Sequence, residues 1–365
     1  MFMCHSFSSL FSLIARVRNR DIFPQMESES VTLSEFIEAD RAGQIRIQDE
    51  RRYFKTDVVW RNVGMFILLH TAAIYGFYLG LFFAKWETLV FAWLVHLFSG
   101  MLGITAGAHR LWSHKSYKAT LPLRVILMIA QTTALQNDIY EWCRDHRVHH
   151  KFSETDGDPH NSKRGLFFAH MGWLMMKKDQ MVIEKGRKID CTDLLEDPVV
   201  AFQRRFYRPL AILFCFVLPG VLPVVLWNES ILVSYFFPTF SRYVFTLHMT
   251  WLVNSAAHFF GDKPYDRFIK ATENGLVTLC TGGEGWHNYH HTFPQDYRAA
   301  ELGWWRFNLT TNFIDCMAWL GLVMDRKSVS LEMAWRRAKK SGDGTHEKEL
   351  KWILERLAEE LPVNW

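Results

Sequence analysis

Apolar runs separated by polar stretches organise this chain of 365 residues. Four runs are long enough to cross a hydrocarbon core of about 30 Å as helices. They span residues 62–83, 86–108, 209–227 and 231–253. A soluble helix rarely stays apolar on every side for that length, so we interpret the runs as membrane spans rather than buried core helices. Very short linkers, 84–85 and 228–230, join the spans into two hairpins, so both linkers must emerge on the same side of the membrane.

Basic residues flank the open ends of both hairpins. They precede the first and third spans and follow the second and fourth: Arg51, Arg52, Lys55, Arg61, Arg110, Lys115, Lys118, Arg204, Arg205, Arg208, Arg267 and Lys270. Because cytosolic segments next to spans are rich in Lys and Arg, this pattern predicts that both termini are cytosolic. The predicted fold is an all-α integral membrane protein, with four transmembrane helices in two hairpins and a cytosolic helical cap formed by residues 109–208 and 254–344.

Two terminal segments lie outside this expected domain of residues 59–344. Residues 1–58 form a cytosolic N-terminal extension. Residues 345–365 form an amphipathic tail, in which an apolar stripe marks one face of a helix at 347–361. The stripe consists of Leu350, Ile353, Leu354, Leu357 and Leu361. Such a helix is typical of packing or contact with a membrane surface, and partner binding is the alternative.

Charge and cysteine content narrow the class of protein. The net charge of +4 gives no reason to propose nucleic-acid binding, whereas the basic belt suits the anionic headgroups of membrane lipid. The six cysteines show no C-x-x-C pair, and the predicted cytosolic compartment is reducing. Both facts argue against a disulfide framework or a zinc ribbon.

Histidine occurs in two copies of the pattern H-x-x-H-H, HRVHH at 146–150 and HNYHH at 287–291. Residues three and four apart share a helix face, so each triple can aim three imidazoles at a single point. The triples are His146, His149 and His150, and His287, His290 and His291. Neutral imidazole is the commonest protein ligand for transition metals. The repeated pattern therefore predicts a metal site.

Three more histidines lie where the spans meet the cap. His109 and His114 are five residues apart, about 140° on an ideal α-helix, so we expect the helix to bend or end between them. His258 follows Asn254 by one turn, and both can face the same site. The remaining histidines, His5, His70, His96, His160, His170, His248 and His346, lack partners at ligand spacing along the chain. Among these, we expect His70 and His96 to be hydrogen-bonded or packing residues within spans and His160 to support the ligands from outside.

Nine histidines exceed the needs of one zinc ion, which takes four ligands or three and a water. Two metal ions are required. Zinc has no redox chemistry, whereas iron with imidazole ligands and open positions can activate oxygen. Ferritin-like sites bridge their irons through paired E-x-x-H helices, and Glu284 to His287 is the only such spacing near these clusters. A pair of irons bound mainly by histidine is therefore a distinct class of oxygen site.

Five segments closely resemble the membrane acyl-CoA Δ9 desaturases, the stearoyl-CoA desaturase family. They are GITAGAHRLWSH (103–114), NDIYEWCRDHRVHHKFSETDGDPHN (137–161), RGLFFAHMGWL (164–174), TWLVNSAAH (250–258) and GEGWHNYHHTFP (283–294). The resemblance extends from about Val59 to Gly344. It implies a di-iron centre under the cytosolic cap, with Asn254 holding a metal-bound water. The ligands it implies are His109, His114, His146, His149, His150, His258, His287, His290 and His291.

The implied activity is insertion of a cis double bond at the ninth carbon of a saturated fatty acyl-CoA, palmitoyl or stearoyl, at the endoplasmic reticulum membrane. Oxygen is the co-substrate, and cytochrome b5 with its reductase supplies electrons. An H-P-G-G haem-binding stretch is not found in the sequence, so we expect cytochrome b5 to be a separate protein.

The resemblance also implies contacts along the substrate path. The residues that match coenzyme A contacts are Asn62, Asn137, Arg144, Asp145, Lys177, Lys178 and Trp251, and those that match the lining of the acyl tunnel are Trp142 and Trp173. In this family, side chains of the second span close the blind end of the tunnel. Trp93 and Leu97, one helical turn apart, are the candidates here. Packing against lipid or another helix is the alternative role for both.

Two other classes of protein remain open on the sequence. A histidine-rich di-iron membrane hydroxylase would share the metal chemistry and return an oxygen atom to the lipid. A zinc membrane hydrolase would need fewer ligands and no reductant. Product analysis distinguishes the first, and oxygen dependence distinguishes the second.

Overall fold

The structure is a computed structural model that describes residues 56–301 and 307–347. Nearly all regular structure in these residues is helical. The one sheet found there is a two-stranded antiparallel pair, β1 (Lys118–Ala119) with β2 (Val323–Met324). Almost all of the predicted N-terminal extension and the predicted tail helix at 347–361 lie outside the described residues.

The first predicted hairpin is present. Helix α3 (Trp60–Phe83) begins two residues before the expected span, and α4 (Trp86–His96) runs directly into η1 (Leu97–Ser113). The second helix therefore extends five residues beyond the predicted end at 108. Segment η1 is wound as a π-helix, in which each N–H bonds to the carbonyl five residues earlier. The wider winding determines the directions of His109 and His114 at its end.

The second hairpin is built from longer helical runs than expected. Helix α10 (Pro198–Ala211), η4 (Ile212–Val217) and α11 (Leu218–Trp227) follow one another without a gap, with a break in helical geometry at Phe206. The return run comprises α12 (Ile231–Tyr235), η5 (Phe236–Ser241) and α13 (Arg242–Asn254). Three runs in the described part of the chain are long and apolar enough to cross a membrane: 60–83, 86–113 and 198–227.

The run at 231–254 is not among these three, and Arg242 is its most polar residue. This side chain is buried, and its guanidinium donates to the carbonyl oxygens of Pro238, Thr133 and Cys215. The run therefore buries a charged side chain between the helices, and backbone carbonyls accept its hydrogen bonds.

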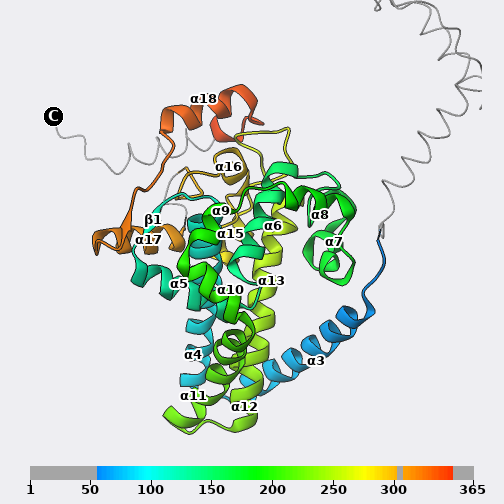
Figure 1. The fold of residues 1–365 in the computed structure, drawn as a ribbon, viewed down its shortest axis with the longest axis vertical. Helices are drawn as coiled ribbons and strands as arrows, with labels where there is room; N and C mark the ends of the chain where they lie inside the picture. Colours follow the sequence, from blue (N-terminus) through cyan, green and yellow to red (C-terminus); the bar gives the residue numbers. More distant parts are fainter. Residues whose placement is uncertain (1–55, 302–306, 348–365) are drawn as a thin grey trace, which may run out of the picture. The chain divides into compact units, whose positions relative to one another are not determined.

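The two short linkers lie side by side at one end of the helices (Figure 1). The Lys85 backbone N–H donates to Glu229 Oε2 at 2.9 Å, and the Lys85 ammonium donates to the carbonyls of Trp227 and Asn228 at 2.9 and 2.8 Å. Thr88 donates to the same Glu229 oxygen at 2.5 Å. These bonds join the hairpins where they turn, as the short linkers required.

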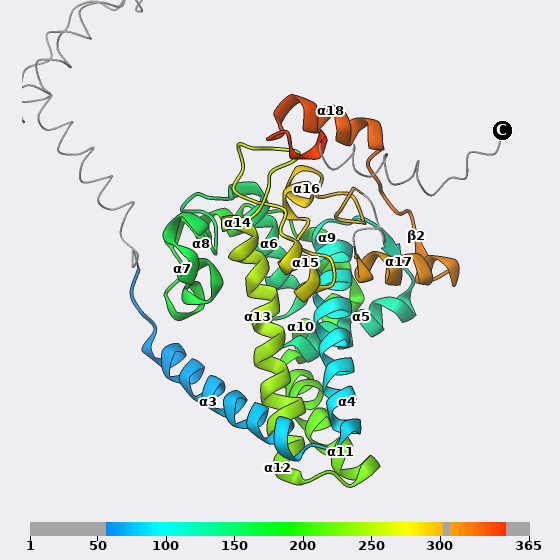
Figure 2. The same ribbon diagram turned by 180° about the vertical axis from the view of Figure 1, so that it is seen from behind.

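Helix α3 touches the other helical runs closely at one end and diverges from α13 at the other (Figures 1 and 2). At the close end, a Cβ atom on Gly76 would lie 2.3 Å from Ser241 Oγ and 2.5 Å from the Phe236 carbonyl oxygen. Only glycine permits this backbone approach. The divergence at the other end leaves room for a cavity between α3 and α13.

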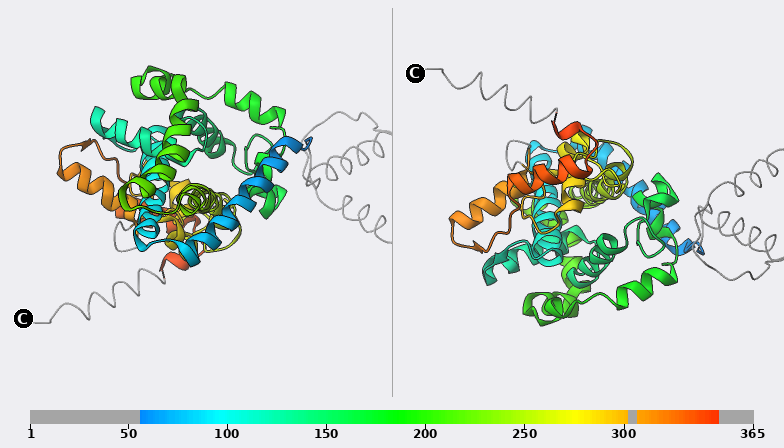
Figure 3. Two further views of the ribbon diagram at one scale, coloured as in Figure 1. Left: turned by 90° about the horizontal axis from the view of Figure 1, so that it is seen from below. Right: turned by 90° about the horizontal axis from the view of Figure 1, so that it is seen from above.

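Short helices form the cap around the ends of η1 and α13 (Figure 3). They are α5 (Leu121–Ala134), α6 (Ile139–Phe152), η2 (Ser162–Arg164), α7 (Leu166–His170), η3 (Gly172–Met175), α8 (Gln180–Arg187), α9 (Thr192–Glu196), α14 (Ala256–Phe259), α15 (Gly275–Thr281), α16 (His287–Thr292), α17 (Leu309–Trp319) and α18 (Leu331–Ser341). The main cap core packs η1 against α5, α6 and α10 around Leu111, Leu127, Ile139 and Val200.

Candidate metal centre and substrate path

Two short helices carry most of the site histidines. Helix α6 begins at Ile139 because the Asp138 side chain accepts a hydrogen bond from the Glu141 backbone N–H at 2.9 Å, which caps the helix. Helix α16 begins at His287. The remaining histidines come from η1, from the residue after it and from α14.

The nine predicted ligands form two groups. In each group, the available ring nitrogens all lie within 4.8 Å of one another. The five-histidine group contains His109, His114, His146, His150 and His290. The four-histidine group contains His149, His258, His287 and His291.

Neighbouring Nε2 atoms within each group are close together. His109 and His290 are separated by 2.9 Å, and His290 and His150 by 3.0 Å. In the other group, His287 Nε2 lies 3.0 Å from His291 Nε2 and 3.1 Å from His258 Nε2. Nitrogen ligands about 2.1 Å from one metal ion stand about 3 Å apart, so these separations suit shared coordination.

Each H-x-x-H-H triple is divided between the two groups. On α6, His146 and His150 join the five-histidine group while His149 joins the four-histidine group; on α16, His287 and His291 join the latter while His290 joins the former. The expectation that each triple aims at a single point is therefore wrong. Residues i and i+4 differ by about 40° around a helix, whereas i+3 and i+4 differ by about 100°, so one triple serves two neighbouring points.

The helix neither bends nor ends between His109 and His114. The π-winding of η1 continues to Ser113, and the His114 backbone N–H bonds to the His109 carbonyl at 3.2 Å. A π-helix takes more residues per turn than an α-helix, so residues five apart lie closer to one face, and both rings reach the five-histidine group. The predicted bend was wrong because it assumed α-helical winding.

Carboxylates hold three of these rings from behind. The Nδ1 atoms of His149 and His258 lie 2.9 and 3.1 Å from carboxylate oxygens of Asp158 and Glu154. His109 Nδ1 lies 3.0 Å from Glu284 Oε2. A carboxylate can only accept, so each Nδ1 carries the proton, and each Nε2 lone pair faces its group.

The pKa shifts of these groups favour neutral histidine rings and an ionised Glu284 carboxylate, as this geometry requires. Burial lowers the pKa of most of these rings well below the ordinary histidine value: His114, His146, His150, His287, His290 and His291. Burial raises the pKa of the Glu284 carboxyl, but Arg110 and His109 outweigh it and hold that pKa at about 2. Neutral imidazole lone pairs converge at two points, a donor set that fits two transition-metal ions, and the five rings at one point exceed the four ligands of zinc.

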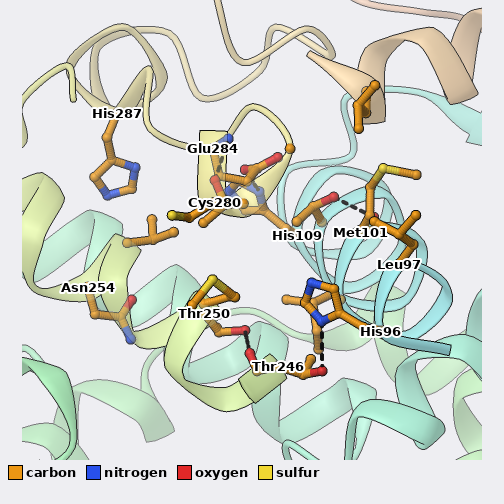
Figure 4. A pocket seen from close by; sticks show the side chains of 18 of the residues that line it. His96, Leu97, Met101, His109, Thr246, Thr250, Asn254, Cys280, Glu284 and His287 are labelled. Carbon is orange, nitrogen blue, oxygen red and sulfur yellow. Dashed lines mark hydrogen bonds and ion pairs between the residues drawn. The ribbon is translucent and has the colours of Figure 1, made fainter. Parts of the chain in front are cut away.

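A cavity of about 910 Å³ leads from the histidines along η1 and α13; we call it the deep cavity (Figure 4). His109, His146, His149, His287 and Asn254 are among the residues that line it. Farther along are Trp93, Leu97, Met101, Ile104, Met249 and Val253. Trp93 and Leu97 thus line the same cavity as the histidines, at the position along the second span expected for a blind end.

A second cavity, the middle cavity of about 1000 Å³, lies between α3, α13 and η3. It shares Trp142, His146, Thr250 and Asn254 with the deep cavity, so the two meet beside the histidines. Its lining includes most of the residues expected along the substrate path: Asn62, Asn137, Trp142, Asp145, Trp173 and Trp251.

A third cavity, the head cavity of about 640 Å³, adjoins the middle cavity at Asp145 and is lined by Arg144, Lys178 and Arg187. Asp145 accepts from Arg144 at 2.9 Å and from Lys178 at 2.5 Å. Lys177 lies outside the lining of all three cavities, with its exposed ammonium 3.0 Å from Asp57. Six of the seven expected coenzyme A contacts therefore follow one path.

Known proteins were compared with this chain. The family model "Fatty acid desaturase" matches residues 84–312. An acyl-CoA Delta-9 desaturase of Acheta domesticus is 55% identical over 297 residues, which covers 81% of this chain and 82% of that protein. The Delta(9)-fatty-acid desaturase fat-7 of Caenorhabditis elegans is 51% identical, with 87% and 93% covered. Stearoyl-CoA desaturase 5 of Bos taurus is 54% identical, with 88% and 99% covered.

The chain belongs to the fatty acid desaturase family. The resemblance inferred from the histidine motifs is confirmed, and this desaturase is an oxidoreductase.

The sequence patterns of the desaturase did not predict the carboxylates that contact Nδ1 of three histidine rings. Glu154 and Asp158 follow the α6 triple by four and eight residues. Acidic residues close to a histidine cluster were a usable signal, because metal-bound histidines commonly donate their second N–H to a carboxylate. Glu284 was noticed only for its spacing to His287, and its contact with His109 required the tertiary fold.

Three histidines outside both groups form a chain of their own in the desaturase. His248 Nε2 lies 3.2 Å from His70 Nε2, and His248 Nδ1 lies 2.9 Å from His170 Nε2. Distant elements bring these partners together, although their spacing along the chain suggested none. His96 instead bonds to Thr246 at 2.9 Å, and His160 lies beside Asp158 and His149.

Proposed function

We propose that this protein is an acyl-CoA Δ9 desaturase, which inserts a cis double bond into palmitoyl- or stearoyl-CoA in an oxygen-dependent reaction. The single observation that carries the proposal is the pair of histidine groups where the deep and middle cavities meet. The relatives named above as Delta-9 and stearoyl-CoA desaturases support the substrate class and the position of the double bond.

Two iron ions are the metals that we assign to the histidine groups, with Asn254 holding a metal-bound water. When bound, they supply the redox chemistry that an unactivated methylene C–H demands. The overall reaction removes two hydrogens from the acyl chain. One O2, two electrons and two protons from outside the substrate complete the formation of two waters.

The chain's own residues select which carbon reacts. Arg144 and Lys178 in the head cavity bind the phosphates of coenzyme A, Asn62, Asn137 and Trp251 contact the pantetheine part, and Lys177 contacts the head group from the edge. Trp142 and Trp173 direct the acyl chain past the histidines into the deep cavity. Because the head group is fixed at one end, the distance to the histidines determines the reacting carbon.

The membrane arrangement follows from the helical runs. We assign four spans in two hairpins, with 231–254 as the fourth, both termini cytosolic, and the endoplasmic reticulum as the location. The fourth run supports this because it packs beside the other three and its buried Arg242 has backbone acceptors. Electrons come from cytochrome b5 and its reductase, which approach from the cytosolic cap.

The deciding experiment is expression in yeast that cannot desaturate fatty acids, followed by gas chromatography of its lipids. We expect growth without added unsaturated fatty acid and a cis-9 product. A hydroxylated fatty acid would indicate the related hydroxylase chemistry. Absence of both products from a correctly inserted protein that carries two irons would contradict the proposal.

A further inference from the structure

Glu284 stands at a spacing that binds metal in other di-iron proteins. In ferritin-like sites, an E-x-x-H pair on one helix supplies a carboxylate and an imidazole to the same centre. Here Glu284 precedes His287 by three residues and lies beside the five-histidine group. Its carboxylate nevertheless contacts a ring from the side opposite the metal-facing nitrogen.

The backbone before His287 is the first reason. Helix α15 ends at Thr281 and α16 starts at His287, so Glu284 is not on the helix that carries His287. Gly283 has φ of +127°, and a Cβ atom there would lie 2.9 Å from Asn308. The chain is therefore held in a conformation that removes the helical alignment of Glu284 with His287.

Arg110 is the second reason. Its Nη2 donates to Glu284 Oε1 at 2.6 Å, while His109 Nδ1 lies 3.0 Å from Oε2. Both carboxylate oxygens are thus engaged. The Arg110 side chain is 1% exposed; its Nη1 donates to Tyr297 O, Arg298 O and Thr311 Oγ1, and its Nη2 also donates to Asn308 Oδ1.

A buried carboxylate without its cation would seek another one. Ionised groups inside proteins require a charge partner or a metal. Carboxylate oxygen is a good ligand for iron. The nearest alternative for Glu284 is the ion bound by the five-histidine group, one imidazole away.

We propose that Arg110 is a positioning residue that withholds Glu284 from the metal and so keeps the five-histidine group free of carboxylate ligands. This inference rests on the proposed function, because it presupposes two bound irons. Arg110 acts through Glu284, whose carboxylate in turn contacts the ligand His109.

The four-histidine group has no comparable cation in the described residues. Asp158 bonds to His149 and to the backbone N–H groups of Glu154 and His160. Glu154 bonds to His258 and to the Ser162 hydroxyl. The contact between Arg110 and Glu284 is therefore specific to the five-histidine group, and its removal should alter only the iron at that group.

The test is Mössbauer spectroscopy of the 57Fe holoenzyme in detergent, with iron content measured on the same samples. The variants are Arg110→Met, Arg110→Lys, Glu284→Gln and the double variant Arg110→Met/Glu284→Gln. Arg124→Met is the control, because Arg124 on α5 forms a partly buried ion pair with Asp197 at 2.8 Å, away from the histidine groups. Wild type should contain two irons, and a wild type with fewer would overturn the proposed function rather than this inference alone.

In Arg110→Met, we expect a changed quadrupole splitting at one of the two irons, because Glu284 becomes a ligand. The double variant should return to the wild-type spectrum, and Arg110→Lys and Arg124→Met should keep it. An unchanged spectrum in Arg110→Met, or a double variant that keeps the altered spectrum, overturns the proposal.

Arg110→Met could fail to fold, because its guanidinium bonds to several acceptors. Glu284→Gln is then the independent measurement. If Glu284 is no ligand, this variant keeps both irons and the wild-type spectrum, since the Gln oxygen can still accept from His109. Loss of one iron or a changed spectrum in Glu284→Gln would show that Glu284 itself binds metal, which contradicts the role assigned to Arg110.

Discussion

The two ends of the deep cavity are built in opposite ways. At the histidine end, three of the nine rings are held by a carboxylate at Nδ1: His109 by Glu284, His149 by Asp158 and His258 by Glu154. At the other end, Trp93 and Leu97 meet the cavity through apolar contacts, and Trp93 remains 55% exposed. Polar bonds determine direction, whereas apolar packing determines mainly volume. The histidine end should therefore tolerate almost no substitution, and the far end should tolerate substitution with a change in selectivity.

Loss of a ligand should have the largest effect. His149→Ala removes the one ring that α6 contributes to the four-histidine group, and His290→Ala removes the one ring that α16 contributes to the five-histidine group. We expect each variant to abolish product formation while membrane insertion persists. Iron per chain should fall below two. Gas chromatography and metal analysis measure these results, with His248→Asn as the control outside both groups. Normal product yield from either alanine variant would refute the ligand assignment.

Loss of a supporting carboxylate should have a smaller effect at the same end. Asp158→Ala removes the acceptor of His149 Nδ1–H, and such changes typically cost about 10- to 100-fold in metal affinity. Asp158→Asn retains an acceptor and should lose less. Iron retained after dialysis against a graded chelator series measures the affinity. Equal retention in wild type and Asp158→Ala would show that orientation of His149 does not depend on this bond.

The head cavity should show an intermediate effect on binding. Arg144→Ala removes a cation from its lining, and a charge-assisted bond to phosphate contributes about 2 kcal/mol. We expect KM for acyl-CoA to rise by about tenfold or more, with little change in kcat at saturation. Arg326→Ala, which removes an exposed pair with Asp315, is the control. A fall in kcat with unchanged KM would place Arg144 outside the substrate path.

The far end of the deep cavity should show the smallest effect on rate and the clearest effect on selectivity. If Trp93 and Leu97 close the tunnel, palmitoyl-CoA is preferred over stearoyl-CoA, with about 1 kcal/mol or more of discrimination for each excluded methylene. Leu97→Ala and Trp93→Ala should then shift the preference toward eighteen carbons. Competition assays with both substrates measure the ratio, with Leu94→Ala, whose side chain is exposed and outside the lining, as control. An unchanged ratio would remove this role.

The helices were predictable because their signal is local. Apolar runs located the start of α3 to within two residues and the ends of α3 and α11, and the linkers at 84–85 and 228–230 were found unchanged, whereas the third helical run begins at Pro198 rather than at the expected 209. The nine histidines were identified by their number and spacing. Local pattern did not reveal the π-winding of η1, because π-turns are rare and the apolar run predicts a helix without its hydrogen-bond register.

The amino-acid sequence alone determined the class of protein, the short linkers between the helical runs and the set of histidines that cluster, since these depend on hydrophobicity and on residue type at short spacing. Only the tertiary structure decided how the ligands are shared. Helices α6 and α16 face each other, and each carries three histidine rings. Each helix contributes two rings to one group and one ring to the other group. The same holds for Arg110 and Glu284, which are 174 residues apart and whose contact depends on packing across the whole cap. Such pairings arise from long-range burial, and no short pattern in the chain encodes them.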